Sequence, residues 1–101
     1  MKLSELNPRW VGLTNWESDN IFYIGISFDS PLNSGQRLAI LFEPPIDPNN
    51  MAARYGIGKI FPDRRHWQRT GDSIANLSLT PSIDFSDHKE WHGFITNGEV
   101  T

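Results

Sequence analysis

The stretch IFYIGISF, residues 21–28, gives the clearest indication of the fold. Its apolar side chains at positions 22, 24, 26 and 28 alternate with other residues, which is the period of a half-buried β-strand with all four on one face. Residues 29–35 are rich in turn formers. Residues 37–42 then repeat the alternation, so we expect the two segments to pair as an antiparallel hairpin.

The rest of the chain also favours β-structure. Residues 77–85 and 90–96 are expected to pair through a loop centred on Asp87, and Asn97-Gly98 is typical of a type I′ turn that sends residues 99–101 back. A helical turn limited by Pro8 is expected at the start, and a short helix at residues 51–55. The sequence therefore predicts a mainly β, small single domain over residues 1–101, antiparallel, with long loops and little helix.

Composition limits the classes of function. The chain has 101 residues, enough for one domain, with 38% apolar residues and a formal net charge of -3. Its basic residues form no long run, and Arg64-Arg65 is the densest patch, so nucleic-acid binding is not expected. Because no apolar run approaches ~20 residues, and residues 1–8 lack the apolar core of a signal peptide and contain Glu5, we expect no membrane contact and a cytoplasmic protein of a bacterial host cell.

Ser82 and His92 are the candidate catalytic pair. In the expected hairpin, Ser82 lies directly opposite His92, and the same register pairs Leu79 with Ile95 and Ile83 with Trp91. Both faces are then chemically consistent, and a one-residue slip would destroy that agreement. Opposed side chains have Cβ atoms about 4.5–5.5 Å apart, close enough for a hydrogen bond between hydroxyl and imidazole. Pro81 lacks a ladder donor, which predicts an edge strand or a local irregularity that leaves Ser82 accessible.

A serine nucleophile also needs a group that orients its base. Four residues are candidates for this role, and the sequence does not choose among them: His66, Asp72, Asp84 and His88. Substrate contact is expected from Trp67, Thr80 and Trp91. Thr80 shares the face of Ser82 in the expected register, and Trp67 lies beside His66, where the two can line a groove. A tryptophan at that place is also a common core anchor.

Three segments, WQRTGD (67–72), LSLTPSI (77–83) and WHGFITNGEV (91–100), resemble a family of small bacterial and phage proteins with a domain of unknown function, some encoded in bacterial ubiquitination-like (Bub) operons. The stretches GISFD (25–29) and GQRL (35–38) also match that family's pattern. The resemblance covers most of the chain. It implies a zinc-stapled small β domain and, for the Bub-operon members, a serine peptidase acting on a ubiquitin-like protein, with the serine at Ser82 and the histidine at His92.

The chain departs from this family at every metal ligand. The family's cysteines fall on Ser30, Leu32, Ser34 and Lys89, and the chain contains no cysteine. Four thiolates make a tetrahedral zinc site, which these replacements cannot form. The three histidines do not reach metal-ligand spacing as a set, so we expect no zinc and no cofactor. Because a structural zinc stabilises a small domain strongly, something must substitute for it, and the tryptophan-rich core is the expected source.

Two functions therefore remain open. The first is a serine hydrolase or peptidase acting on a ubiquitin-like or other protein, with Ser82 as nucleophile and His92 as general base. The second is a non-catalytic phage or prophage accessory protein that binds a host or structural protein through Trp16, Trp67 and Trp91. Both imply a protein partner, and a Ser82 hydroxyl out of reach of His92 with no cleft beside it would favour the second. The oligomeric state is not determined by the sequence.

Overall fold

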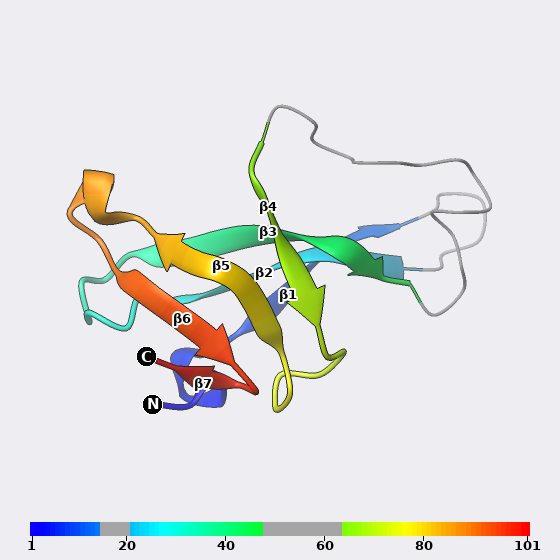
Figure 1. The fold of residues 1–101 in the computed structure, drawn as a ribbon, viewed down its shortest axis with the longest axis horizontal. Helices are drawn as coiled ribbons and strands as arrows, with labels where there is room; N and C mark the ends of the chain where they lie inside the picture. The colour runs from blue at the N-terminus through cyan, green and yellow to red at the C-terminus, as the bar shows by residue number, and fades with distance from the viewer. Residues whose placement is uncertain (15–20, 48–63) are drawn as a thin grey trace.

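The computed structural model describes residues 1–14, 21–47 and 64–101, and it confirms the mainly β fold. Seven strands form one sheet whose spatial order follows the chain, from β1 to β7 (Figure 1). All strand pairs are antiparallel except β3 with β4, which run parallel. The elements are the 3-10 turn η1 (Leu3–Leu6), β1 (Arg9–Thr14), β2 (Ile21–Asp29), β3 (Arg37–Ile46), β4 (His66–Thr70), β5 (Ser78–Asp84), the 3-10 turn η2 (Ser86–His88), β6 (His92–Thr96) and β7 (Glu99–Val100).

The sheet curls so that β5, β6 and β7 lie across β2 and β3 (Figure 1). Buried side chains from both halves form one core, in which the rings of Phe28 on β2 and Trp91 before β6 meet edge to face at 6.0 Å. Trp67 of β4 is also buried in this core, at 7% exposure. The tryptophan-rich core is therefore made by folding one sheet onto itself. No helix within the described residues combines the length and the apolar character needed to cross a membrane.

The β2–β3 hairpin forms as expected, but its faces differ from the prediction. Pairing with β3 is regular from Gly25–Leu41 to Asp29–Arg37. Opposite β1, however, the adjacent residues Val11 and Gly12 pair with Gly25 and Tyr23, so β2 has one extra residue, Ile24. Because a bulge of one residue inverts which face the following side chains occupy, the expected single face divides. Residues 26 and 28 join the main core, whereas residues 22 and 24 form a second small cluster with Val11 and Leu41.

Two strands, β1 and β4, were not expected from the sequence. In β4, HWQRT, Trp67 is the only buried residue and its neighbours are long and polar, so the short strand shows little alternation. In β1 the neighbouring residues Trp10 and Val11 pack against two different apolar clusters, so the strand shows no simple alternation. The short helix expected at residues 51–55 lies outside the described residues.

The chain ends lie side by side and extend the sheet. Asn97 and Gly98 both have positive φ, 48° and 73°, which confirms the expected type I′ turn between β6 and β7. The Leu3 amide donates to the Gly98 carbonyl at 2.8 Å, and the Val100 amide donates to the Met1 carbonyl at 2.7 Å. The amino-terminal residues thus pair along β7, and the expected helical turn near the start is η1.

Gly98 and Gly35 provide a matched test of close packing at this turn. Both have positive φ, but a Cβ at Gly98 would lie 2.6 Å from the Ala75 carbonyl oxygen, whereas a Cβ at Gly35 would meet nothing within 4 Å. We expect Gly35→Ala to lower the free energy of unfolding by about 1 kcal/mol, from the left-handed backbone alone. Gly98→Ala should cost about 1–3 kcal/mol more, because backbone has to move. Urea denaturation of both variants measures the difference, and equal losses would contradict the close approach.

Candidate functional site

The expected pairing of Ser82 with His92 is wrong. The β5–β6 register starts as predicted, with Leu79 opposite Ile95, but it then shifts, and His92 lies opposite Asp84. The shift spans residues 80–82, where Pro81 offers no N–H to the ladder. Within the described chain no hydrogen bond joins Ser82 to His92. The expected irregularity at Pro81 is confirmed, but β5 is flanked by β4 and β6 and is not an edge strand.

Asp84 and His92 face each other across the exposed side of β5 and β6. The pKa of Asp84 is lowered, mainly by hydrogen bonds from the Ser86 hydroxyl and amide, with smaller contributions from the charges of His92 and Arg65. The Ser86 amide lies 2.8 Å from Asp84 Oδ1. Asp84, one of the four candidates for orienting the histidine, is therefore the one that the fold brings to His92.

Of the three other candidates, His88 lines a pocket with Glu90, and His66 and Asp72 do not join this pair either. The β4–β5 pairing ends at Gln68–Thr80, short of His66, whose Nδ1 lies 2.8 Å from the Arg64 carbonyl oxygen. Asp72 follows the far end of β4, where its amide donates to the Asn76 side chain. The three pockets formed by described residues alone are lined by side chains other than Ser82, His92 and Asp72. The structure therefore does not assemble the expected catalytic group.

Two of the three expected substrate-binding residues are buried in the core. Trp91 is 5% exposed and packs in the core, which corrects the expectation that it contacts a partner. Trp67 is buried as well, and its indole Nε1 donates to the Ser82 carbonyl at 3.2 Å. Thr80 is exposed opposite Gln68. Trp16, expected at an interface, lies outside the described residues.

The molecule instead brings together residues that sequence reasoning treated only as lost zinc ligands. The hydroxyls of Ser30 and Ser34, in the β2–β3 connection, both donate to the Glu90 carboxylate, Ser34 at 2.8 Å. Each hydroxyl also accepts a backbone N–H of its own loop, from Leu32 and Gln36 respectively. Two loops are thereby joined through one carboxylate, close to the positions where the resemblance places cysteines. In the sequence, the only indication of this contact is that Glu90 follows Lys89, a position where the resemblance places a cysteine. The spacing of the residues does not show that Glu90 meets Ser30, which is 60 residues away.

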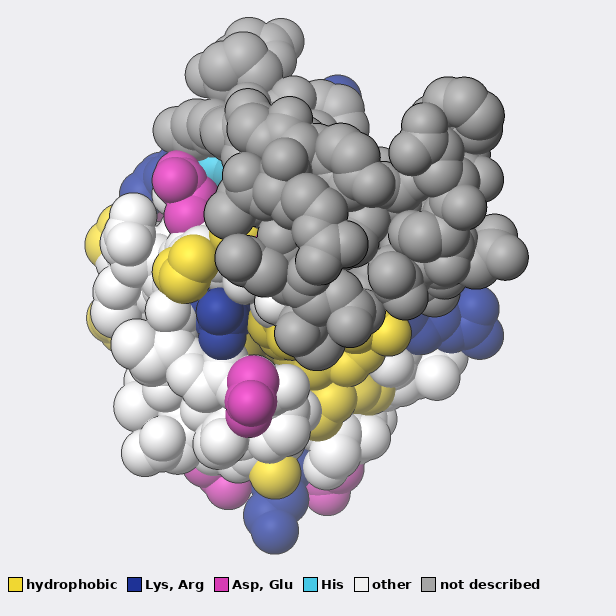
Figure 2. All heavy atoms as spheres, turned by 90° about the vertical axis from the view of Figure 1, so that its right-hand side faces the viewer, with side chains coloured by type: hydrophobic (Ala, Val, Ile, Leu, Met, Phe, Trp, Pro, Cys, Tyr) yellow, Lys and Arg dark blue, Asp and Glu magenta, His cyan; other side chains and the backbone are white. Residues whose placement is uncertain are grey.

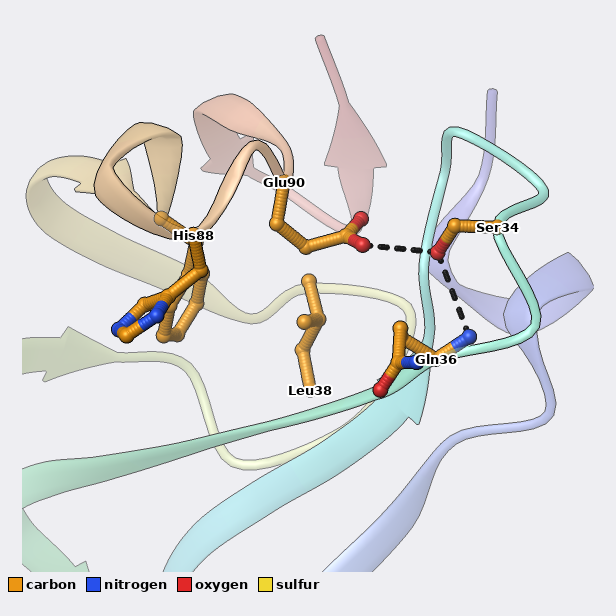
Figure 3. A pocket seen from close by; sticks show the side chains of 6 residues that line it. Ser34, Gln36, Leu38, His88 and Glu90 are labelled. Carbon is orange, nitrogen blue, oxygen red and sulfur yellow. Dashed lines mark hydrogen bonds between the residues drawn. The ribbon is translucent and has the colours of Figure 1, made fainter.

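A pocket of about 490 Å³ opens beside this carboxylate (Figure 3). Glu90, Ser34 and Gln36 line one side, and the His88 side chain lies across from Glu90. Leu38 lies between His88 and Gln36 in this view, and it lines the apolar part of the pocket with Phe85. The pocket combines one charged group, several neutral polar groups and an apolar floor, which is the composition of a site that selects a side chain or a small polar molecule.

Glu90 is held as an anion. Hydrogen bonds from Ser30 and then Ser34 lower its pKa, and the Trp91 amide adds a smaller effect in the same direction. The two ion pairs found among the described residues join other groups, so Glu90 has no cationic partner there. The carboxylate is therefore fixed in orientation, ionised at neutral pH and available to a positive charge from outside.

A second pocket of about 310 Å³ adjoins the first at Phe85. It is lined by Ala39 and Leu41 of β3, by Trp67, and by Arg64 and Arg65. The Arg65 guanidinium lies over the Trp67 ring, 4.7 Å from the ring centroid. The two pockets follow β3 one after the other, the first acidic and the second basic.

Charge elsewhere is mixed. In the view of Figure 2, basic and acidic side chains are interspersed around exposed apolar ones, with no continuous basic stripe among the described side chains. No three His, Asp or Glu side chains in the described ranges are grouped so that they could hold a metal ion.

The hydrogen bonds to the Glu90 and Asp84 carboxylates predict how the pKa of each acid changes when a donor is removed. Because the pKa of Glu90 is below its usual 4.5 in the folded state, its stabilising contribution is present above that value and is lost as the pH falls through the lowered pKa. Ser30→Ala with Ser34→Ala should move the Glu90 midpoint back up, as followed by carboxyl carbon NMR. Ser86→Ala is the control: it should raise the Asp84 midpoint and leave Glu90 unchanged. An unmoved Glu90 midpoint in the double variant would contradict the network.

Comparison of the chain with protein-family models, with curated proteins and with solved structures found no match in any of the three. The family resemblance of the sequence motifs therefore stays a prediction, and the candidate site rests on its own geometry.

Proposed function

We propose that this chain is a non-catalytic accessory protein that binds a protein partner at the Glu90 pocket. The observation that carries the proposal is an ionised carboxylate, oriented by two hydroxyls, at the rim of a pocket with an apolar floor and without a cationic partner among the described residues. A fixed charge beside apolar surface is suited to capturing one side chain of a partner.

The β5–β6 register supports binding over catalysis. With His92 opposite Asp84, no hydrogen bond joins the Ser82 hydroxyl to a base in the described chain, and Ser82 lines none of the three pockets formed by described residues alone. Nucleophilic catalysis requires such a base and a concave place for the reacting group. Among the described residues, neither feature is seen at Ser82, whereas the Glu90 pocket can bind a side chain without any further group.

A displayed library of random dodecapeptides, selected on the immobilised full chain, tests the proposal. Selected peptides should bind the wild type and should lose binding to Gln36→Phe, because the new ring fills the pocket that Gln36 lines. Gln68→Phe is the matched control, since Gln68 is an exposed strand residue that lines neither this pocket nor the second one. Failure to recover any peptide that binds the free chain, or equal loss in both variants, would overturn the proposal.

A serine hydrolase is the second candidate, favoured by one observation. Asp84 lies opposite His92, as an orienting carboxylate would, and Ser82 precedes it by two residues on the same strand. A diagonal cross-strand neighbour is about 7–8 Å away between Cα atoms, so the hydroxyl would have to approach the imidazole on substrate binding.

A fluorophosphonate probe distinguishes the two candidates. A hydrolase should be labelled in the wild type and in Ser4→Ala, and should lose labelling in Ser82→Ala, with parallel loss of cleavage of a ubiquitin-like precursor. The binding function predicts no labelling in any of the three proteins. Labelling that depends on Ser82 would establish the hydrolase and remove the proposal that the chain is non-catalytic.

A further inference from the structure

Among the described residues, no strand pairs with the edge of β3 beside the two pockets. The Ser30 amide donates to the Gln36 carbonyl at 2.9 Å, which marks residues 30 and 36 as a hydrogen-bonded pair of the β2–β3 ladder. Such pairs alternate along antiparallel strands, so Leu38 and Ile40 also bond to β2, while Arg37 and Ala39 direct their backbone N–H and C=O groups to the other side.

On that other side, pairing with β4 begins only at Leu41, opposite His66, and continues to Glu43. Arg64 and Arg65 precede β4 but do not extend the ladder, and a pocket lies between them and Ala39. Within the described chain, therefore, no strand pairs with β3 at Arg37 and Ala39 on this side. Unpaired backbone groups at a sheet edge are a template for adding a strand.

This edge of β3 leads directly to Glu90. Leu38, between Arg37 and Ala39, lines the Glu90 pocket together with Phe85, and Ala39 lines the second pocket. A peptide strand along this edge would place alternate side chains at the pockets, since the side chains of a strand point to opposite faces in turn. The apolar floor suits the methylene stem of a long side chain, and the carboxylate suits a positive end group.

Glu90 also selects the kind of cation. Its oxygens Oε1 and Oε2 each already accept one hydroxyl, from Ser30 and Ser34. Each oxygen keeps a second acceptor position, so a bidentate arginine would have to share both oxygens with the serines, whereas a lysine ammonium is a point charge that needs only one remaining lone pair. The site is therefore built for lysine over arginine.

We infer that the partner binds as an extended segment that adds a strand to β3 at Arg37 and Ala39 and inserts a lysine side chain beside Glu90. This inference rests on the proposed protein-binding function. It adds the conformation of the bound segment and the identity of the side chain that the pocket takes.

Capped synthetic copies of the library-selected dodecapeptides provide the test with the full chain. Each should contain a lysine whose replacement by norleucine weakens binding by about tenfold, which corresponds to ~1.4 kcal/mol, and whose replacement by arginine weakens it measurably. Glu90→Gln should remove the preference for lysine over norleucine. Asp87→Asn, which makes the same change of charge on the neighbouring turn η2, should keep it.

Backbone pairing is tested with the same peptides. N-methylation of the peptide backbone should abolish binding at every second position and should be tolerated at the positions between them, because only alternate amides of an added strand face β3. Binding should also slow hydrogen exchange of the Arg37 and Ala39 amides. If peptides bind without a lysine preference, or without these amide changes, the inference fails while the protein-binding function stands. If no peptide binds the wild type, the proposed function fails and the inference with it.

Discussion

A single sheet has to bury its own apolar face, and the rest of the structure depends on this constraint. Within the described residues the only helical segments are the short turns η1 and η2, which are too small to cover seven strands. The sheet therefore curls until its second half packs over β2 and β3. The edge-to-face contact of Phe28 and Trp91 joins the two halves, and such aromatic pairs contribute about 0.5–1.5 kcal/mol beyond the area that they bury.

The curl also creates the candidate site. Where the sheet bends, β3 and β4 share only the register from Leu41 to Glu43. The remaining edge of β3 faces the loop that follows β5, and the space between them contains the two pockets that meet at Phe85. The serine–carboxylate contacts at Glu90 hold that loop against the β2–β3 connection, so the same residues maintain the curl and shape the pocket.

The register of strand pairing determines which side chains lie next to each other on the surface. The alternation of apolar and polar residues predicted the buried faces of β5 and β6, and Leu79 and Ile95 do pair as expected. Pro81 predicted a local irregularity, but the alternation could not predict how many residues the ladder skips there, because a period of two fixes the face of a side chain and not its partner. That shift replaces Ser82 by Asp84 opposite His92. In β2, a similar irregularity sends residues 22 and 24 to a separate cluster.

The sequence by itself determined the features that depend on neighbouring residues: the β class, the β2–β3 hairpin and the Asn97-Gly98 turn, because alternation and turn chemistry act over a few residues. Only the tertiary structure decided the parallel pairing of β3 with β4 and the meeting of Ser30 with Glu90, which are 60 residues apart. Contacts at that separation depend on how the whole sheet curls to bury its core, and no local pattern records the direction or extent of that curl.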